Sequence, residues 1–292
     1  MSTALSAGAP PVEGPLAIVC GAGSLPFAVA DAAKQRGRGV VLFALRGSAD
    51  AERVAGYPHH WVAVSQIGTV CRLARRAGCR DLVFIGSVVR PAFRDLWPDA
   101  HTLPLLPRFI RLFRGGDSRL LSGIASVFEE QGFRVLGAHD VAPQILMPEG
   151  PLGRYQPNAA DQDDIAQGLA FLRATGPFDV GQAVVVARRR VLAVEAAEGT
   201  DNMLARLAEL RGGGRIRAVG GVLVKAPTPG QDRRMDLPTI GPQTIEGAAR
   251  AGLVGVAVIA GSTIVAEAER IAALADDARC FVLGVRHEAP ER

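Results

Sequence analysis

The sequence contains few aromatic residues and few cysteines. Aromatic side chains make up 5% of the 292 residues, and no stretch interleaves them with basic residues as a nucleic-acid groove would, so no nucleic-acid partner is expected. The four cysteines show no C-x-x-C spacing and no nearby histidine or cysteine partners, which predicts buried, reduced thiols in a cytosolic protein. The net charge of only +4 suits an anionic small ligand or an acidic membrane surface.

The sequence also lacks an apolar segment long enough to cross a membrane. The most apolar run, Ala251–Ala266, is shorter than the roughly 20 residues that a spanning helix needs, and it is interrupted by Gly252, Gly255 and Gly261. We therefore expect a helix end, a buried strand and a turn there. Residues 1–14 are small, polar and rich in proline, which predicts a flexible tail rather than a signal peptide.

Several common hydrolase signatures are missing. There is no G-x-S-x-G turn, no H-E-x-x-H helix and no Glu-rich Nudix helix, and the five histidines form no D-x-H or G-N-H set. A hydrolase with this sequence must therefore combine carboxylates with a hard cation. That requirement favours Mg²⁺, or Mn²⁺ in its place, over Zn²⁺.

What the sequence does contain is an alternation of short aliphatic runs with helical segments. Runs such as Leu16–Cys20 end in glycine turns and are followed by helices of about ten to fifteen residues, which indicates βαβ units. Residues 15–148 are therefore expected to form a Rossmann-like parallel-sheet domain. A Pro- and Gly-rich linker follows at residues 149–157, and adjacent strand pairs over residues 158–292 predict a second α/β domain with a mixed sheet.

The first glycine turn, GAGSLP, lies between a strand and a helix, where backbone N–H groups and the helix dipole attract phosphate. Proline occupies the third glycine position of a dinucleotide fingerprint, and Arg46 stands where an acidic residue is expected. NAD is therefore disfavoured, and either a phosphate contact or a bare tight turn remains open. The residues of this turn are Gly21, Ala22, Gly23, Ser24, Leu25 and Pro26.

A second turn, GSVVRP, follows the fourth expected strand, and ligands of open parallel sheets bind at such strand ends. Gly86 and Ser87 would then share one rim with the first turn, and Arg90 is either a phosphate ligand or a solvated loop residue. Residues 106–121 alternate cations with Phe, Ile and Leu, which suits an anionic lipid or, alternatively, a core helix with a solvated basic face. Asp117 follows two glycines, and this position favours a helix cap over a catalytic role.

In the second half, Glu195 and Glu198 end a strand, and Thr200 or Asp201 begins a helix. Glu198 and Asp201 flank one turn. Their oxygens therefore either converge on a cation or serve the helix start, where Thr200 or Asp201 is the alternative cap.

The loop TPGQDRRMDLPTIGP, residues 228–242, gathers charges between prolines that forbid a regular helix through most of it. Asp232 and Asp236 are about 13 Å apart in an extended chain and about 6 Å apart in one helical turn. Either the segment coils, or the two carboxylates have separate roles. Lys225 and Arg234 can screen them or neutralise a diphosphate. A stiff, charged loop at a strand end is costly without a ligand, so we expect function here.

Motifs along the whole chain resemble one family. The segments GSVVRP, RGGDSRLL, VLAVEAAEGTDNML and GGVLVKAPTPGQDRRMDLPTIGPQTI follow one another as in the LpxI-type UDP-2,3-diacylglucosamine pyrophosphatases of lipid A biosynthesis. The resemblance covers Leu16 to Val285. Cys20 and Ala22 depart from it mildly, since the family usually has Ala or Gly at the first of these positions and often Gly or Ser at the second.

The resemblance implies Mg²⁺-dependent hydrolysis of the diphosphate in UDP-2,3-diacylglucosamine, with water attacking the sugar-side phosphorus. The products would be UMP and 2,3-diacylglucosamine 1-phosphate, and the substrate would be held between two domains. Such a lipid-linked UDP-sugar also implies transient contact with the cytoplasmic face of the inner membrane. A non-catalytic sugar-nucleotide or lipid binding module and a Rossmann oxidoreductase are the alternatives.

We assign site roles on this basis. The expected catalytic residues are Asp232, Lys225 and Gln231, with Asp232 orienting the water or holding the metal. The expected metal ligands are Asp232, Asp236, Glu198 and Asp201. The expected substrate contacts are residues 21–26, Gly86, Ser87, Arg90, Gly116, Asp117, Thr200 and Arg234, and residues 105–113 are expected to receive the acyl chains.

Overall fold

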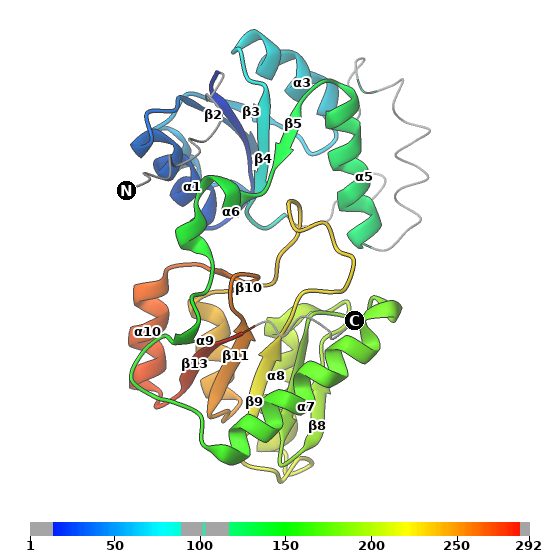
Figure 1. Cartoon of the computed structure of the whole chain (residues 1–292), viewed down its shortest axis with the longest axis vertical. Coiled ribbons are helices and arrows are strands. Elements are labelled where there is room, and N and C mark those ends of the chain that lie inside the picture. Colours follow the sequence, from blue (N-terminus) through cyan, green and yellow to red (C-terminus); the bar gives the residue numbers. More distant parts are fainter. Residues whose placement is uncertain (1–13, 89–101, 103–116, 287–292) are drawn as a thin grey trace, which may run out of the picture. The chain divides into compact units, whose positions relative to one another are not determined.

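The computed structural model describes residues 14–88, residue 102 and residues 117–286 (Figure 1). Contacts divide the chain into two compact units, Met1–Ala142 and Pro143–Arg292. The division falls before the expected domain boundary at residue 148. Residues 143–157, which include the expected linker, belong by their contacts to the second unit and contribute the 3₁₀ turn η3 (Pro143–Ile145) and a short strand to it.

The first unit contains a five-stranded sheet in which every pairing is parallel, as expected from the βαβ pattern. Its order is β3 (His59–Val62), β2 (Val40–Leu45), β1 (Leu16–Cys20), β4 (Asp81–Ile85) and β5 (Arg134–Leu136). The central strand β1 is buried along its whole length, which explains why its sequence is a continuous apolar run instead of an alternating one.

Helices cover this sheet, and glycines or capping residues set their ends. They are α1 (Leu25–Gln35), α2 (Ala51–Val54), α3 (Ile67–Arg76), α5 (Asp117–Glu130) and α6 (Ala138–Val141). Helix α1 packs on β1 and α6, and α5 packs on β5 (Figure 1). Phe128 of α5 meets Phe84 of β4 edge to face, with ring centroids 5.3 Å apart.

One expected element of the first unit is wrong. The sequence predicts a strand through residues 133–141, whereas the strand ends at Leu136 and a helical turn follows. The backbone N–H of Gly137 donates to Asp140 Oδ2 at 2.9 Å, so this aspartate holds the start of α6 closed. A carboxylate at the third residue of a helix that binds the N-cap amide satisfies one of the free donors at the helix start and so stabilises this helical turn.

The second unit contains a mixed six-stranded sheet, as expected. Its order is β6 (Gly150–Pro151), β13 (Phe281–Val285), β11 (Gly255–Ile259), β9 (Val222–Lys225), β7 (Ala183–Ala187) and β8 (Arg190–Val194). The three central strands β13, β11 and β9 are parallel, and the outer pairings are antiparallel. Strands β10 (Thr239–Ile240) and β12 (Ile264–Val265) form a separate parallel pair.

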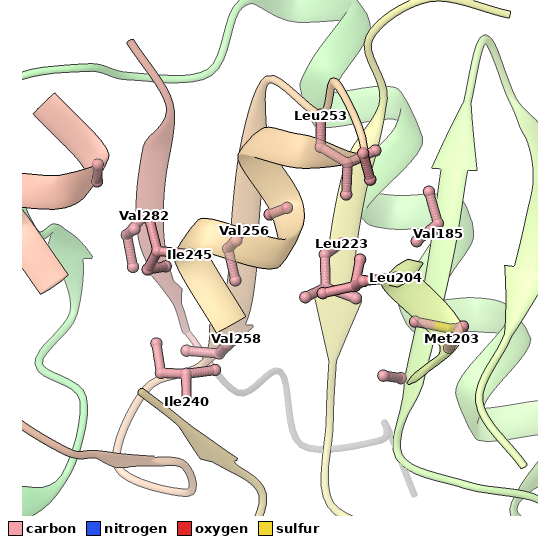
Figure 2. Close-up of a cluster of buried hydrophobic side chains, with 14 of the residues drawn as sticks. Val185, Met203, Leu204, Leu223, Ile240, Ile245, Leu253, Val256, Val258 and Val282 are labelled. Carbon is pink, nitrogen blue, oxygen red and sulfur yellow. The ribbon is translucent and has the colours of Figure 1, made fainter. Parts of the chain in front are cut away.

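Two apolar cores cover the two faces of this sheet. Helix α7 (Ala159–Thr175), which is followed by the 3₁₀ turn η4 (Gly176–Phe178), packs on β7 and β9. The other core involves α8 (Gly199–Gly212), α9 (Pro242–Arg250) and α10 (Ala268–Asp277). Figure 2 shows this second core, where Met203 and Leu204 of α8 lie beside Leu223 of β9. Burial on both faces fixes where each strand ends, and hence where the polar residues beyond it lie.

The sequence QAVVVARRRVLAV predicts a β-hairpin about the three arginines at residues 188–190, and this prediction is confirmed, because β7 and β8 pair antiparallel. Arg188 and Arg189 both have positive φ, at 52° and 58°, as a two-residue hairpin turn requires. Asp164 of α7 accepts hydrogen bonds from both of their backbone amides, at 3.0 and 2.6 Å. Within the part of the chain that the structure describes, no helix combines the length and the apolar character needed to span a membrane.

Candidate functional site

Lys225, the last residue of β9, is a buried charge with an exposed fraction of 6%. Its Nζ donates to Thr200 Oγ1 in the first turn of α8 at 2.9 Å and to the carbonyl oxygen of Thr239 in β10 at 3.1 Å. An ammonium group has three N–H donors. One donor is thus left without an acceptor among the described residues.

The electrostatic surroundings of Lys225 act in two directions. Burial lowers the pKa of its ammonium group from the ordinary value, because the charged form loses hydration. The carboxylates of Glu195, Asp201 and Asp236 act in the opposite direction. Acidic groups from the end of β8, from α8 and from the charged loop therefore oppose loss of the proton from this buried cation.

Two residues outside the predicted site connect Lys225 with the charged loop. Glu195 follows β8, and its Oε1 accepts from Thr200 Oγ1 at 2.7 Å while its Oε2 accepts from the backbone N–H of Gln182 at 2.9 Å. The side-chain amide of Gln182, just before β7, donates to Gln231 Oε1 at 3.0 Å and to Asp236 Oδ2 at 3.1 Å. One continuous polar network thus runs from β9 to the loop.

The charged loop forms a single helical turn between its prolines. The amides of Met235 and Asp236 donate to the carbonyl oxygen of Asp232, at 3.0 and 3.1 Å. Of the two conformations considered from the sequence, extended or coiled, the loop therefore has the coiled one. The two carboxylates nevertheless have separate partners. Asp232 accepts from Arg234 at 2.8 and 3.0 Å, whereas Asp236 accepts from Gln182. The hydrogen bond from Arg234 lowers the pKa of Asp232, against the opposing effect of burial.

Further bonds fix the shape of this loop. Gln231 Oε1 accepts from the amide of Thr228 at 3.0 Å, and its Nε2 donates to the carbonyl oxygen of Asp236. Arg233 Nη2 donates to the carbonyl oxygen of Gly261 at 2.7 Å and to Ser262 Oγ at 3.1 Å, beyond β11. The loop is therefore closed on itself by Gln231 and attached to a neighbouring turn by Arg233.

The four carboxylates expected to bind a cation do not form one cluster. Glu198 pairs with Arg206 at 2.7 Å, and Asp201 is exposed on α8. Within residues 14–88, 102 and 117–286, no three His, Cys, Asp or Glu side chains are close enough to hold a metal ion together. The donor atoms are all oxygens, which suits Mg²⁺ or Mn²⁺. The ligand type fits such a cation, while a complete protein ligand set is not assembled in this region.

In the first unit, the two glycine turns bind each other. The amides of Gly21 and Ala22 donate to the carbonyl oxygens of Ile85 and Ser87, at 2.9 and 2.8 Å, and the amide of Ser87 donates back to Ala22 at 3.1 Å. These amides are thus used within the fold, at the carboxyl ends of β1 and β4. Glycine is required because a Cβ on Gly21 would lie 2.6 Å from the carbonyl oxygen of Ser87.

The rest of the first turn leads into α1. Gly23 is exposed and has φ of 96°, and the carbonyl oxygen of Ser24 accepts from the amides of Phe27 and Ala28, both at 3.2 Å. Leu25 and Pro26 begin the helix, with proline in the first turn as expected. Asp117 is the first residue of α5. Arg90, Gly116 and the expected acyl-chain segment at residues 105–113 lie outside the described residues.

Sequence reasoning did not select Gln182 or Glu195. Glu195 and Glu198 stand three residues apart after the same strand, and only the tertiary structure separates them, since Glu195 contacts Thr200 and Glu198 contacts Arg206. The available signal for Glu195 was its position immediately after β8. Gln182 offers no such signal, because its role depends on a loop almost fifty residues later in the chain.

Comparisons with known proteins agree along most of the chain. Residues 15–145 match the LpxI N-terminal domain family, and residues 148–283 match the LpxI C-terminal domain family. The UDP-2,3-diacylglucosamine pyrophosphatase LpxI of Caulobacter vibrioides is 43% identical over 272 residues, which cover 92% of this chain and 97% of that protein.

A comparison with solved structures gives a weaker likeness. The UDP-glucose 4-epimerase of Thermus thermophilus, in complex with NAD, aligns over 95% of this chain and 87% of its own chain. The sequence identity is 14% and the TM-score is 0.30, so this likeness carries no inference about fold or function.

Proposed function

The chain belongs to the LpxI family, and from this membership we propose that it hydrolyses the diphosphate of UDP-2,3-diacylglucosamine to UMP and 2,3-diacylglucosamine 1-phosphate, a step of lipid A biosynthesis. The observation that carries the proposal is the 43% identity with the Caulobacter vibrioides pyrophosphatase over almost the whole length of both proteins. The buried ammonium group of Lys225, beside a charged loop, supports it, because a diphosphate is a ligand that such a cation would hold.

Hydrolysis of a phosphoanhydride needs cations that stabilise the developing negative charge and a group that orients the attacking water. In our proposal, the third donor of Lys225 binds a phosphate oxygen, and Gln231 and Arg234 contact the diphosphate from the loop. Asp232 orients the water or contacts the cation. Arg234 holds Asp232 in the structure, so binding of the diphosphate by Arg234 would release this carboxylate.

We further propose that the reaction uses Mg²⁺ or Mn²⁺, with Asp232 and Asp236 as the chain's principal oxygen donors and Glu198 and Asp201 as further candidates. These two aspartates lie within one helical turn, whereas Glu198 already pairs with Arg206. When bound, the cation would neutralise charge on the diphosphate. The incomplete protein ligand set is consistent with a cation that shares its coordination with substrate oxygens.

The remaining assignments are proposals for the first unit and for the location of the protein. The turns at residues 21–26 and 86–87 would contact the nucleotide or its phosphates, together with Arg90, Gly116 and Asp117. In the second unit, Thr200 is a separate proposed substrate contact. A substrate with two acyl chains resides in a lipid surface, so we propose that the protein works at the cytoplasmic face of the inner membrane as a peripheral protein. Flotation with liposomes that contain the substrate would test this location.

The central experiment compares Asp232→Asn with the unsubstituted protein. Products formed in ¹⁸O-labelled water with Mg²⁺ are followed by phosphorus NMR, which shows whether the anhydride is cleaved and which phosphorus takes up the oxygen. We expect a fall in turnover of at least about 100-fold for Asp232→Asn, the size typical of a lost transition-state contact. Asp277→Asn, at the exposed end of α10, is the matched control.

Two outcomes would contradict the proposal. If the unsubstituted protein binds the UDP-sugar and releases no UMP at any Mg²⁺ concentration, the chain is a binding module. If Asp232→Asn turns over at the rate of Asp277→Asn, the loop carboxylate has no role in the reaction.

A further inference from the structure

We propose that Gln182 and Glu195 are positioning residues for this site: Glu195 orients the Thr200 hydroxyl that binds Lys225, and Gln182 fixes the charged loop relative to both. The inference rests on the proposed hydrolase function. Neither residue is expected to contact the substrate, so each acts through a residue that does.

The hydroxyl group of Thr200 has a single hydrogen, and this fixes the role of Glu195. Thr200 Oγ1 lies 2.7 Å from Glu195 Oε1 and 2.9 Å from Lys225 Nζ. A carboxylate can only accept and an ammonium can only donate, so the threonine gives its hydrogen to Glu195 and turns a lone pair toward Lys225. Glu195 therefore sets the direction in which Thr200 holds the ammonium group.

The side-chain amide of Gln182 has two hydrogens to donate. Both are committed to the charged loop, one to Gln231 Oε1 and the other to Asp236 Oδ2. These two loop residues lie on either side of Asp232, so one side chain holds both ends of the turn that carries the proposed catalytic carboxylate. Without that amide, the turn at residues 231–236 would lose both of these hydrogen bonds, whereas its internal bonds, the anchor through Arg233 and the bond from Lys225 to Thr239 would remain.

The sheet supplies the rigid base from which both residues act. Ala183 of β7 is the register partner of Lys225 in β9. The amide of Ala226 donates to the carbonyl oxygen of Gln182 at 3.1 Å, and the amide of Glu195 donates to Ala183 at 2.9 Å. Three adjacent strand ends thus place the glutamine, the glutamate and the lysine at fixed separations before any ligand arrives.

A purely structural role explains this arrangement less well. Partly buried charged and amide groups lose hydration, and buried ion pairs can often be replaced by apolar side chains of similar size without loss of stability. The side-chain amide of Gln182 binds Gln231 and Asp236. The carboxylate of Glu195 binds Thr200 and the backbone amide of Gln182, and Thr200 in turn accepts from Lys225. The network therefore serves the residues that the proposed reaction uses.

The test uses the full chain with Gln182→Ala and Glu195→Gln. Their matched controls are Gln243→Ala on α9 and Glu209→Gln on α8, both exposed positions of the same unit. We expect kcat for UMP release to fall about 10- to 100-fold in the two network variants, as expected for lost hydrogen bonds to charged groups. For Gln182→Ala, the unfolding midpoint should stay close to the control value, because the loop and not the core is loosened.

Hydrogen exchange read by mass spectrometry provides a second, activity-independent measurement. In Gln182→Ala, peptides that cover residues 226–238 should exchange faster than in the control, while peptides from β7, β9 and β11 should exchange as before. If Gln182→Ala does not fold, Gln182→Glu replaces it, because it keeps the length of the side chain and loses both amide donors.

The outcomes separate the two proposals. If the unsubstituted chain releases no UMP, the proposed function fails, and hydrogen exchange still decides whether Gln182 holds the loop. If the unsubstituted chain is active and both network variants have the kcat of their controls, the positioning inference is wrong. A kcat loss that only matches a loss of folded protein, with loop exchange unchanged, would also overturn it.

Discussion

The close contact between the two glycine turns of the first unit leads to a sharp prediction. Gly21→Ala should destabilise this unit far more than Gly23→Ala, although the substitutions are chemically identical and two residues apart. At Gly21, an added Cβ would lie 2.6 Å from the carbonyl oxygen of Ser87 and 2.7 Å from two backbone atoms of Gly86. At Gly23, it would meet nothing within 4 Å.

The magnitudes follow from these surroundings. Backbone atoms cannot rotate away, so the alanine at position 21 forces the turns apart, with an overpacking cost of about 1–3 kcal/mol. The separation also weakens the two hydrogen bonds between Ala22 and Ser87, each of which contributes about 1 kcal/mol. We expect a total near 4 kcal/mol, the sum of about 2 kcal/mol from each source. Gly23 has φ of 96°, so its alanine variant carries only the left-handed backbone cost, about 1–2 kcal/mol.

Tryptophan fluorescence suits the measurement, because Trp61 lies in β3 of the first unit and the other tryptophan, Trp97, also precedes residue 143 in the sequence. Thermal unfolding of the full chain should show a midpoint lower by about 12 °C for Gly21→Ala and by about 4 °C for Gly23→Ala, at about 3 °C per kcal/mol for a unit of this size. Equal midpoints, or a larger loss for Gly23→Ala, would refute the steric reasoning.

The other stability and reactivity predictions concern buried groups. Asp81 is 3% exposed and is bound by Arg38 and Arg134. Asp81→Asn should lower the free energy of unfolding by about 3 kcal/mol. Most of this loss comes from the pair with Arg38, because Arg134 is largely exposed and its charge is screened by solvent. Burial alone would raise the pKa of Asp81, but the hydrogen bonds from Arg134 and Arg38 lower it overall. This stabilisation is therefore complete above the ordinary carboxyl pKa of about 4 and is lost as the pH falls through the folded-state pKa, so urea titrations of Asp81→Asn and the unsubstituted protein should converge in acid. Burial raises the pKa of Cys20 to about 11 and that of Cys280 to about 12. Iodoacetamide at about pH 8 should therefore label both thiols at least about 100-fold more slowly in the folded protein than in the urea-unfolded protein. Labelling at equal rates would show that these thiols are accessible in the folded protein.

The sequence by itself determined the α/β class and most element positions. Aliphatic runs bounded by glycines became the buried strands of both sheets, and the capped helix after Asn158 formed as its capping residues indicate, with Asp161 closing the box. These features are local, because periodicity and capping act within a few residues. Residues 133–141 differ from the expected strand: the strand ends at Leu136 and a helical turn follows, in which Asp140 accepts from the amide of Gly137.

The sequence also identified the charged loop and Lys225, because prolines and clustered charges are visible without a fold. Only the tertiary structure decided how their side chains pair. It placed Asp232 with Arg234, Asp236 with Gln182 and Glu198 with Arg206, and thereby separated carboxylates that the sequence had grouped around one cation. The Asp236–Gln182 pairing depends on strand order, which is set by contacts between segments that lie far apart in the chain, whereas Asp232–Arg234 and Glu198–Arg206 are local pairs that the sequence alone left open.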